Sequence, residues 1–169
     1  MAYQATTRNL PQCAVIDLKG SADDIAPRLQ SLGLPTPVAG RAVRSGAMEL
    51  LKAGPEHWLL LAPLDQEDRL LHALQANALA ADSLVLGVSD LYQFFAIEGV
   101  DARQLVAVAS PLDAGPVTFP ADGATFTEAF GQRVLLLRRP QGFDLAVESS
   151  YASMFAEYFS RINPGGYRS

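Results

Sequence analysis

The sequence repeats one order of predicted elements, and this repeat constrains the fold more than any other feature of the chain. A strand that turns through a glycine into a short helix is predicted twice, at residues 13–32 and 94–109. A strand that leads into a longer helix is also predicted twice, at residues 57–78 and 143–162. The halves share little sequence identity, so the repeat lies in the pattern of elements. It predicts an α+β fold of two β-α-β-β-α units, with helices packed on antiparallel sheet.

Length and composition agree with such a fold. A chain of 169 residues can bury roughly 70% of its unfolded surface without disulfide staples. We expect a single compact domain of two halves, about residues 11–90 and 91–163, with short flexible ends. The residues are 49% apolar and only 18% charged, which excludes an intrinsically disordered chain.

Side-chain periodicity and turn residues set the expected bounds of the elements. Strands are predicted at residues 13–18, 41–44, 48–51, 57–62, 83–89, 94–98, 125–129, 133–138 and 143–147. Helices are predicted at residues 25–32, 65–78, 102–109 and 151–162. Asp24 is the expected N-cap of the first helix, because it would place Pro27 in the first turn. Ser149 or Ser150 is the expected cap of the last helix. A long irregular stretch over residues 111–123 is of the kind that often carries function.

The strand at residues 57–62 is apolar on both faces. Trp58, Leu60 and Ala62 alternate with His57, Leu59 and Leu61. Both faces must therefore be covered, either by elements of this chain or by another chain.

The net charge and the cysteine content indicate which partners and which cellular compartment to expect. A net charge of −5 disfavours nucleic acid, because binding to phosphates needs a positive surface. The single cysteine, Cys13, favours a reducing compartment. No apolar segment approaches the ~20 residues that cross a bilayer, and the first eight residues lack the apolar region of a signal peptide. We expect a soluble, cytoplasmic protein with no membrane partner.

The search for catalytic and binding motifs is mostly negative. No glycine-rich loop for a dinucleotide or a nucleoside triphosphate is found. The segment 87–91 resembles a nucleophile elbow only superficially, because its second glycine is missing. His57, His72 and Cys13 match no zinc-ligand spacing. We therefore expect no catalytic, cofactor or metal residues in this chain.

Three carboxylates at turns and strand ends are the remaining candidates for acid–base chemistry. Asp90, Glu98 and Asp113 have no spacing that would bring them into one pocket. For Asp90 the alternative is capping of the backbone at Tyr92 or Gln93, and for Asp113 it is an Asx turn.

Several segments together resemble one known family, the gamma subunit of sarcosine oxidase. Residues 54–61 look like its G-P-x-x-W-L-L-L segment, and residues 88–90 look like its V-S-D turn. Pro111-Leu112-Asp113 and Phe119-Pro120, continued by Gly123 and Thr125, resemble its P-L-D…F-P signature. The closing strand and helix, Phe143–Val147 with Ser150–Ala152, are also similar. The resemblance runs from about Gly40 to the C-terminus.

This resemblance implies a fold, an activity and a set of partners. The fold would be that of the folate-binding aminomethyltransferases in miniature. The chain would be the non-catalytic gamma subunit of a heterotetramer that oxidatively demethylates sarcosine to glycine and passes the one-carbon unit to tetrahydrofolate. FAD, FMN, NAD, zinc and tetrahydrofolate would be bound by the alpha, beta and delta subunits, and no cofactor by this chain.

Seven residues are the predicted subunit interface: Trp58, Asp90, Leu112, Asp113, Val117, Phe119 and Pro120. Three of the loop residues, Leu112, Val117 and Phe119, are apolar and are stiffened by neighbouring prolines, so they lose little entropy on binding. Two alternatives stay open. One is a free-standing folate-binding module with Asp90 or Glu98 beside the pterin, and the other is a homodimer formed through the aromatic last helix.

Overall fold

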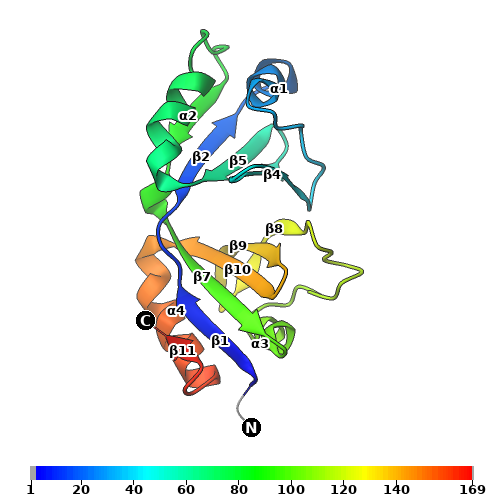
Figure 1. Ribbon diagram of the computed structural model, residues 1–169, viewed down its shortest axis with the longest axis vertical. Helices are drawn as coiled ribbons and strands as arrows, with labels where there is room; N and C mark the ends of the chain where they lie inside the picture. Colours follow the sequence, from blue (N-terminus) through cyan, green and yellow to red (C-terminus); the bar gives the residue numbers. More distant parts are fainter. Residues whose placement is uncertain (1–2, 169) are drawn as a thin grey trace. The chain divides into compact units, whose positions relative to one another are not determined.

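The structure is a computed structural model that describes residues 3–168. Its strands are β1 (Ala5–Asn9), β2 (Ala14–Lys19), β3 (Ala42–Ser45), β4 (Met48–Gly54), β5 (His57–Ala62), β6 (Leu84–Gly87), β7 (Tyr92–Gly99), β8 (Ala124–Ala129), β9 (Gln132–Arg139), β10 (Gly142–Glu148) and β11 (Tyr167–Arg168) (Figure 1). Its α-helices are α1 (Ala22–Ser31), α2 (Glu67–Leu74), α3 (Ala102–Ala109) and α4 (Ala152–Ile162), and single 3₁₀ turns are η1 (Leu64–Gln66), η2 (Ser89–Leu91) and η3 (Ser149–Tyr151).

The chain divides into two compact units, an N-terminal unit of residues 12–89 and a C-terminal unit of residues 1–11 and 90–169. The order β2-α1-β3-β4-β5-α2-β6 in the first unit recurs as β7-α3-β8-β9-β10-α4-β11 in the second. The predicted α+β fold of two repeated units is confirmed, with three strands between the helices of each unit. That the two halves form a single domain stays a prediction.

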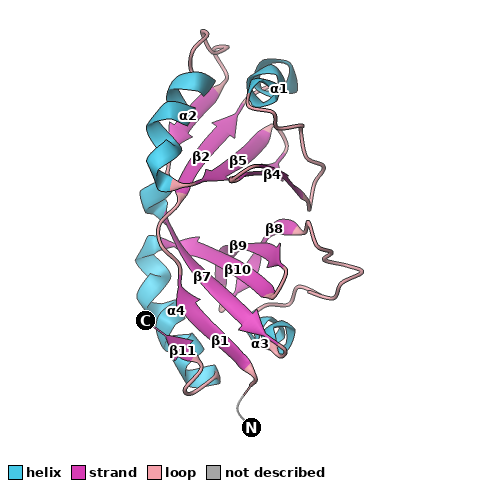
Figure 2. Ribbon diagram, viewed as in Figure 1, coloured by secondary structure: helices cyan, strands magenta, loops and turns pink. Residues whose placement is uncertain are grey.

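The N-terminal unit is a five-stranded antiparallel sheet in the order β3-β4-β5-β2-β6. Helices α1 and α2 lie beside this sheet (Figure 2). Their apolar residues form one core cluster with residues of the sheet. Trp58 and Leu60 of β5 point to one face of the sheet and are buried with Ile25 and Leu29 of α1 and Leu70 of α2. Residues on the other face of β5 are buried too, since Leu59 and Leu61 are at most 6% exposed. The expectation that this strand is covered on both faces is confirmed.

Helix α1 begins three residues earlier than predicted. Ser21 is the N-cap, and its Oγ accepts a hydrogen bond from the Asp24 N–H at 3.4 Å. The prediction of Asp24 as the cap is therefore wrong, and Pro27 lies inside the helix, where its missing N–H removes one backbone hydrogen bond. Burial of Ile25 and Leu29 and hydrogen bonds from Arg28 offset that loss.

The C-terminal unit is a six-stranded sheet in the order β11-β1-β7-β10-β9-β8. Helices α3 and α4 cover one face, and the core between them is rich in phenylalanine. Phe155 and Phe159 of α4 pack on Phe95 of β7, with ring centroids 6.3 and 5.5 Å away. The apolar periodicity of the last helix is thus a core stripe. The predicted serine cap is wrong, because residues 149–151 form a 3₁₀ turn and α4 has no side-chain cap.

Strand β1 was not anticipated from the sequence. It pairs antiparallel with β7 and parallel with β11, and Thr7 in its centre is fully buried. Asn163, itself 1% exposed, donates a hydrogen bond from Nδ2 to the Ala5 carbonyl at 2.7 Å. In its sheet β1 neighbours β7 as β6 neighbours β2 in the other unit. Segments near both chain ends therefore complete the C-terminal sheet.

Candidate functional site

The loop of residues 110–123 joins α3 to β8 and is ordered by its own hydrogen bonds. The Gly115 N–H donates to Asp113 Oδ1 at 2.9 Å, which is the Asx turn expected for Asp113. The Thr118 hydroxyl donates to the Asp113 carbonyl at 2.9 Å, and the Phe119 N–H donates to the Gly115 carbonyl at 2.8 Å. The Gly115 N–H, followed by the Thr118 hydroxyl, lowers the pKa of the Asp113 carboxyl. This carboxylate therefore shapes the loop.

The same loop is anchored to strands β9 and β10. Phe119 is only 3% exposed, and its ring stacks on Phe143 of β10 with centroids 6.3 Å apart. Gly123 lies against that ring so closely that a Cβ there would be 2.8 Å from the Phe119 Cδ2 atom. Arg138 of β9 donates its backbone N–H to the Gly123 carbonyl at 2.8 Å and its Nη1 to the Ala114 carbonyl at 3.2 Å. The loop is thus fixed at both ends and in the middle.

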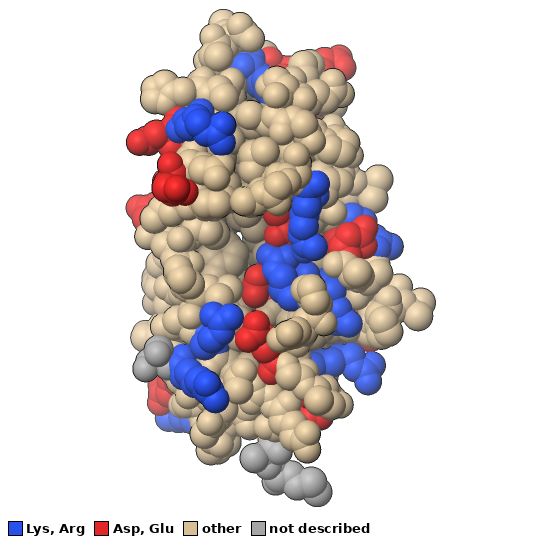
Figure 3. Space-filling model, in the orientation of Figure 1, with Lys and Arg blue, Asp and Glu red and all other residues tan. Residues whose placement is uncertain are grey.

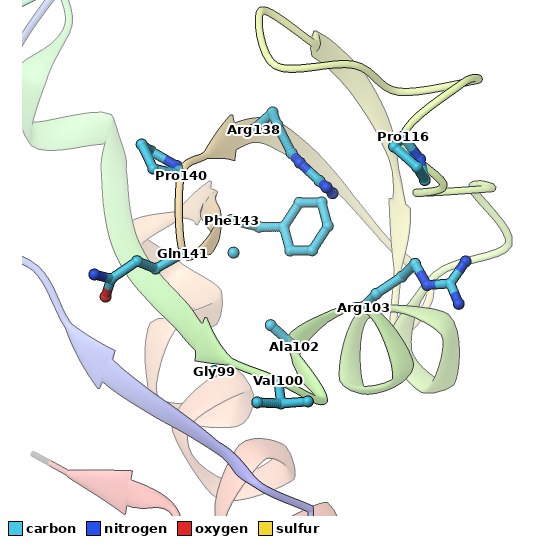
Figure 4. Close-up of a pocket in the computed structure, with 10 residues that line it drawn as sticks. Gly99, Val100, Ala102, Arg103, Pro116, Arg138, Pro140, Gln141 and Phe143 are labelled. Carbon is cyan, nitrogen blue, oxygen red and sulfur yellow. The ribbon is translucent and has the colours of Figure 1, made fainter.

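A pocket of about 530 Å³ lies between this loop, the start of α3 and the β9–β10 turn. Figure 4 shows Arg138 extending over the Phe143 ring, with Pro116 of the loop across from them and Val100 and Ala102 on the remaining side. The Arg138 guanidinium carbon is 4.7 Å from the centre of the Phe143 ring. A smaller hollow of about 180 Å³ adjoins the Arg103 side chain and the loop residues 112–114.

The seven predicted interface residues fall into different environments. Five of them share the loop: Leu112, Asp113, Val117, Phe119 and Pro120. Val117 is 90% exposed, whereas Phe119 is buried as an anchor. Trp58 is 2% exposed in the core of the N-terminal unit, and Asp90 lies exposed in η2. The interface role of these residues stays a prediction, and the exposures make Val117 the apolar member with the most surface to offer.

The two histidines have structural partners, and Glu98 lies 3.4 Å from the Arg8 guanidinium. His57 Nε2 lies within hydrogen-bonding distance of Asp17 Oδ1, and Lys19 Nζ is 3.2 Å from the other oxygen of Asp17. His72 Nδ1 faces the carbonyl of Asp68, one helical turn before it. Within residues 3–168 no group of three or more His, Cys, Asp or Glu side chains is placed to hold a metal ion.

Ser89, the residue at the centre of the elbow-like segment 87–91, is 6% exposed. Its hydroxyl donates to Glu67 Oε1 at 2.7 Å and accepts from the Val15 N–H at 2.8 Å. Both hydrogen bonds lie within the N-terminal unit and tie η2 to α2 and β2. The hydroxyl thus serves to join these elements.

The surface carries few charges, as the composition requires. Figure 3 shows acidic and basic side chains interspersed on the face in view, separated by wide uncharged areas. None of the helices in the described part of the chain has the length and apolar character needed to span a membrane.

A protein-family model described as the sarcosine oxidase, gamma subunit family, matches residues 19–162. The chain belongs to this family. The resemblance seen in the G-P-x-x-W-L-L-L segment and the loop signature is therefore confirmed. A comparison with curated proteins gives no match.

Two solved structures place the fold of this gamma-subunit family member. A chain of the heterotetrameric sarcosine oxidase from Corynebacterium sp. U-96, solved in complex with pyrrole 2-carboxylate, is similar with a TM-score of 0.83 and 22% identity, over 95% of this chain and 86% of that one. The glycine cleavage system aminomethyltransferase T from Bartonella henselae is similar with a TM-score of 0.69 and 15% identity, over 99% of this chain. That match covers 48% of the aminomethyltransferase, so this chain spans about half its length. The expected aminomethyltransferase-like fold is confirmed.

Sequence reasoning missed the residues that line the pocket, among them Val100, Arg103, Arg138 and Phe143. One signal was present at Val100, which stands between the turn formers Gly99 and Asp101 and was therefore poorly placed for burial. The others come from α3 and from the β9–β10 hairpin, and only the folded chain brings them together.

Proposed function

We propose that this chain is the non-catalytic gamma subunit of a heterotetrameric sarcosine oxidase-type complex. The observation that carries the proposal is the match of residues 19–162 to the gamma subunit family. The complex would oxidatively demethylate sarcosine to glycine and transfer the one-carbon unit to tetrahydrofolate.

The use of the polar side chains supports a non-catalytic role. Asp113 accepts the Gly115 N–H within its own loop, Glu67 accepts the Ser89 hydroxyl, and Asp24 is bound by Arg28 of the same helix. Each of these carboxylates fixes local structure, whereas acid–base catalysis needs groups that face a substrate.

The cofactors and the compartment follow as parts of the same proposal. FAD, FMN, NAD, zinc and tetrahydrofolate would be bound by the alpha, beta and delta subunits, and none by this chain. The complex would lie in the cytoplasm, since the single Cys13 is typical of chains kept in a reducing compartment.

Co-expression tests the proposal. The full chain is produced with an affinity tag together with the proposed alpha, beta and delta subunits, and a parallel preparation contains only those three subunits. We expect one complex that retains the flavins and forms peroxide with sarcosine. A chain that purifies alone under these conditions contradicts the subunit assignment.

Titration of the isolated chain with tetrahydrofolate separates this proposal from a folate-binding module. We expect no heat of binding at millimolar ligand. Saturable binding by the isolated chain would instead support the module.

A further inference from the structure

The pocket between α3, the loop of residues 110–123 and the β9–β10 turn is suited to hold part of another protein. Its volume of about 530 Å³ falls within the range of roughly 300–1,000 Å³ typical of binding pockets. It is open to solvent, and exposed apolar side chains lie at its edge and next to one of its lining residues. Val100 at its edge is 82% exposed, and Val117, next to the lining residue Pro116, is 90% exposed. Exposed apolar side chains beside an open pocket are typical of contact with a macromolecule.

The surface is also held in position before any partner binds. Hydrogen bonds at Asp113 and Gly115 and the buried Phe119 ring fix the loop on either side of Val117. A side chain presented by an ordered loop loses less entropy on binding than one on a flexible segment.

Charge decides what kind of partner segment fits. Among the described residues, the charged side chains that line the pocket are Arg103 and Arg138. Arg103 is exposed on α3 and has no ion pair with another described residue. Asp113, in the adjoining hollow, accepts the Gly115 N–H and also interacts electrostatically with Arg103, without an ion pair between them. Two guanidinium groups against this one carboxylate leave the surface with net positive charge. The surface therefore combines exposed apolar groups with positive charge and favours a carboxylate on the partner.

We propose that this surface docks a neighbouring subunit through a segment that inserts an apolar side chain into the pocket and places a carboxylate beside Arg103. We call it the α3–loop surface, formed by Val100, Arg103, Pro116, Val117, Arg138 and Phe143. This inference rests on the proposed function, because the α3–loop surface would be where this subunit binds its partner. Arginine and aromatic residues are enriched at such interfaces, and an anchor that fills a central pocket carries much of the binding energy.

Two substitutions test the surface in the full chain co-expressed with its subunits. Val117→Asp and Arg103→Glu are each expected to weaken assembly at least about tenfold. The matched controls are Val38→Asp, at a valine that is 69% exposed in the N-terminal unit, and Arg69→Glu, at an exposed arginine of α2. Both controls are expected to assemble like the unmodified chain. Because all four side chains are exposed, the melting temperatures are expected to stay unchanged.

The salt dependence of association gives a second readout that a loss of folding would not mimic. Association of the unmodified chain with its partners is expected to slow as ionic strength rises, and Arg103→Glu is expected to reduce this dependence. If the unmodified chain assembles and both variants assemble as well as it does, the α3–loop surface is not the docking site, and the proposed function stands. If the unmodified chain itself fails to assemble, the proposed function is what fails.

Discussion

Replacing Phe119 with alanine is expected to destabilise the isolated chain, because this ring anchors the loop of residues 110–123. The side chain is 3% exposed and stacks on Phe143 at 6.3 Å between centroids. Truncation of a buried phenylalanine to alanine costs about 3–5 kcal/mol. We expect the low end of this range, about 3 kcal/mol, because a surface loop can close on a gap more readily than a strand or helix in a core. For a unit of this size, that corresponds to a fall in melting temperature of roughly 12 °C or more.

Circular dichroism of the purified chain during heating measures this change. Val117→Ala in the same loop is the control, since a side chain that is 90% exposed is expected to change stability by less than about 0.5 kcal/mol. If Phe119→Ala melts within about 2 °C of the unmodified chain, the ring is no anchor. The assignment of Phe119 to the core, and of Val117 alone to the surface, would then be refuted.

Three further predictions follow from contacts in the two units. Arg28 donates five hydrogen bonds, three of them to carbonyls at and after the end of α2. Lysine lacks the planar guanidinium that makes these bonds, so Arg28→Lys is expected to lower the free energy of unfolding by about 1–3 kcal/mol. Urea unfolding followed by Trp58 fluorescence measures this change. An unchanged midpoint would show that these bonds add nothing. The pKa of Asp113 is lowered from 3.8 in the folded chain, so its stabilising contribution is complete above pH 3.8 and is lost as pH falls through the lower folded-state pKa; Asp113→Asn should flatten the acid limb of stability against pH, and an identical limb would contradict this. Gly142 has φ +156°, and a Cβ there would lie 2.0 Å from a backbone carbonyl oxygen of β7. Gly142→Ala is therefore expected to disrupt the β7–β10 pairing and lower the melting temperature. The control is Gly131→Ala, which has open space around it and tests the cost of positive φ alone.

The sequence predicted elements best where local and tertiary preferences agree. Helix α3 was predicted at residues 102–109, the bounds it has, because Asp101 precedes it and Pro111 follows its end. The apolar alternation of β5 was equally informative, since a strand of this composition can only be buried. The order of elements around these two, repeated in both halves, was enough to predict the fold class.

Predictions failed where a distant contact outweighs the local signal. Strand β1 has a polar sequence, and its place in the sheet depends on pairing with β7 and β11, about 90 and 160 residues away along the chain. The first helix begins at Ala22 despite Pro27, since burial of its apolar face favours the longer helix.

The loop shows the same limit at single-residue level. Val117 and Phe119 are both apolar and two residues apart, yet the first is 90% exposed and the second 3% exposed. The turn between them and the position of Phe143 decide which one faces the core. The sequence could therefore identify the loop as a candidate interface but could not say which of its side chains are available to a partner.

Native mass spectrometry of the co-expressed subunits tests the central claim most directly. We expect a complex that contains one copy of this 18.1 kDa chain together with the flavin-bearing subunits. Its mass is expected to fall by that amount when the chain is omitted. A chain that is found only alone, or as a homodimer, beside a complete complex of the other subunits would contradict it.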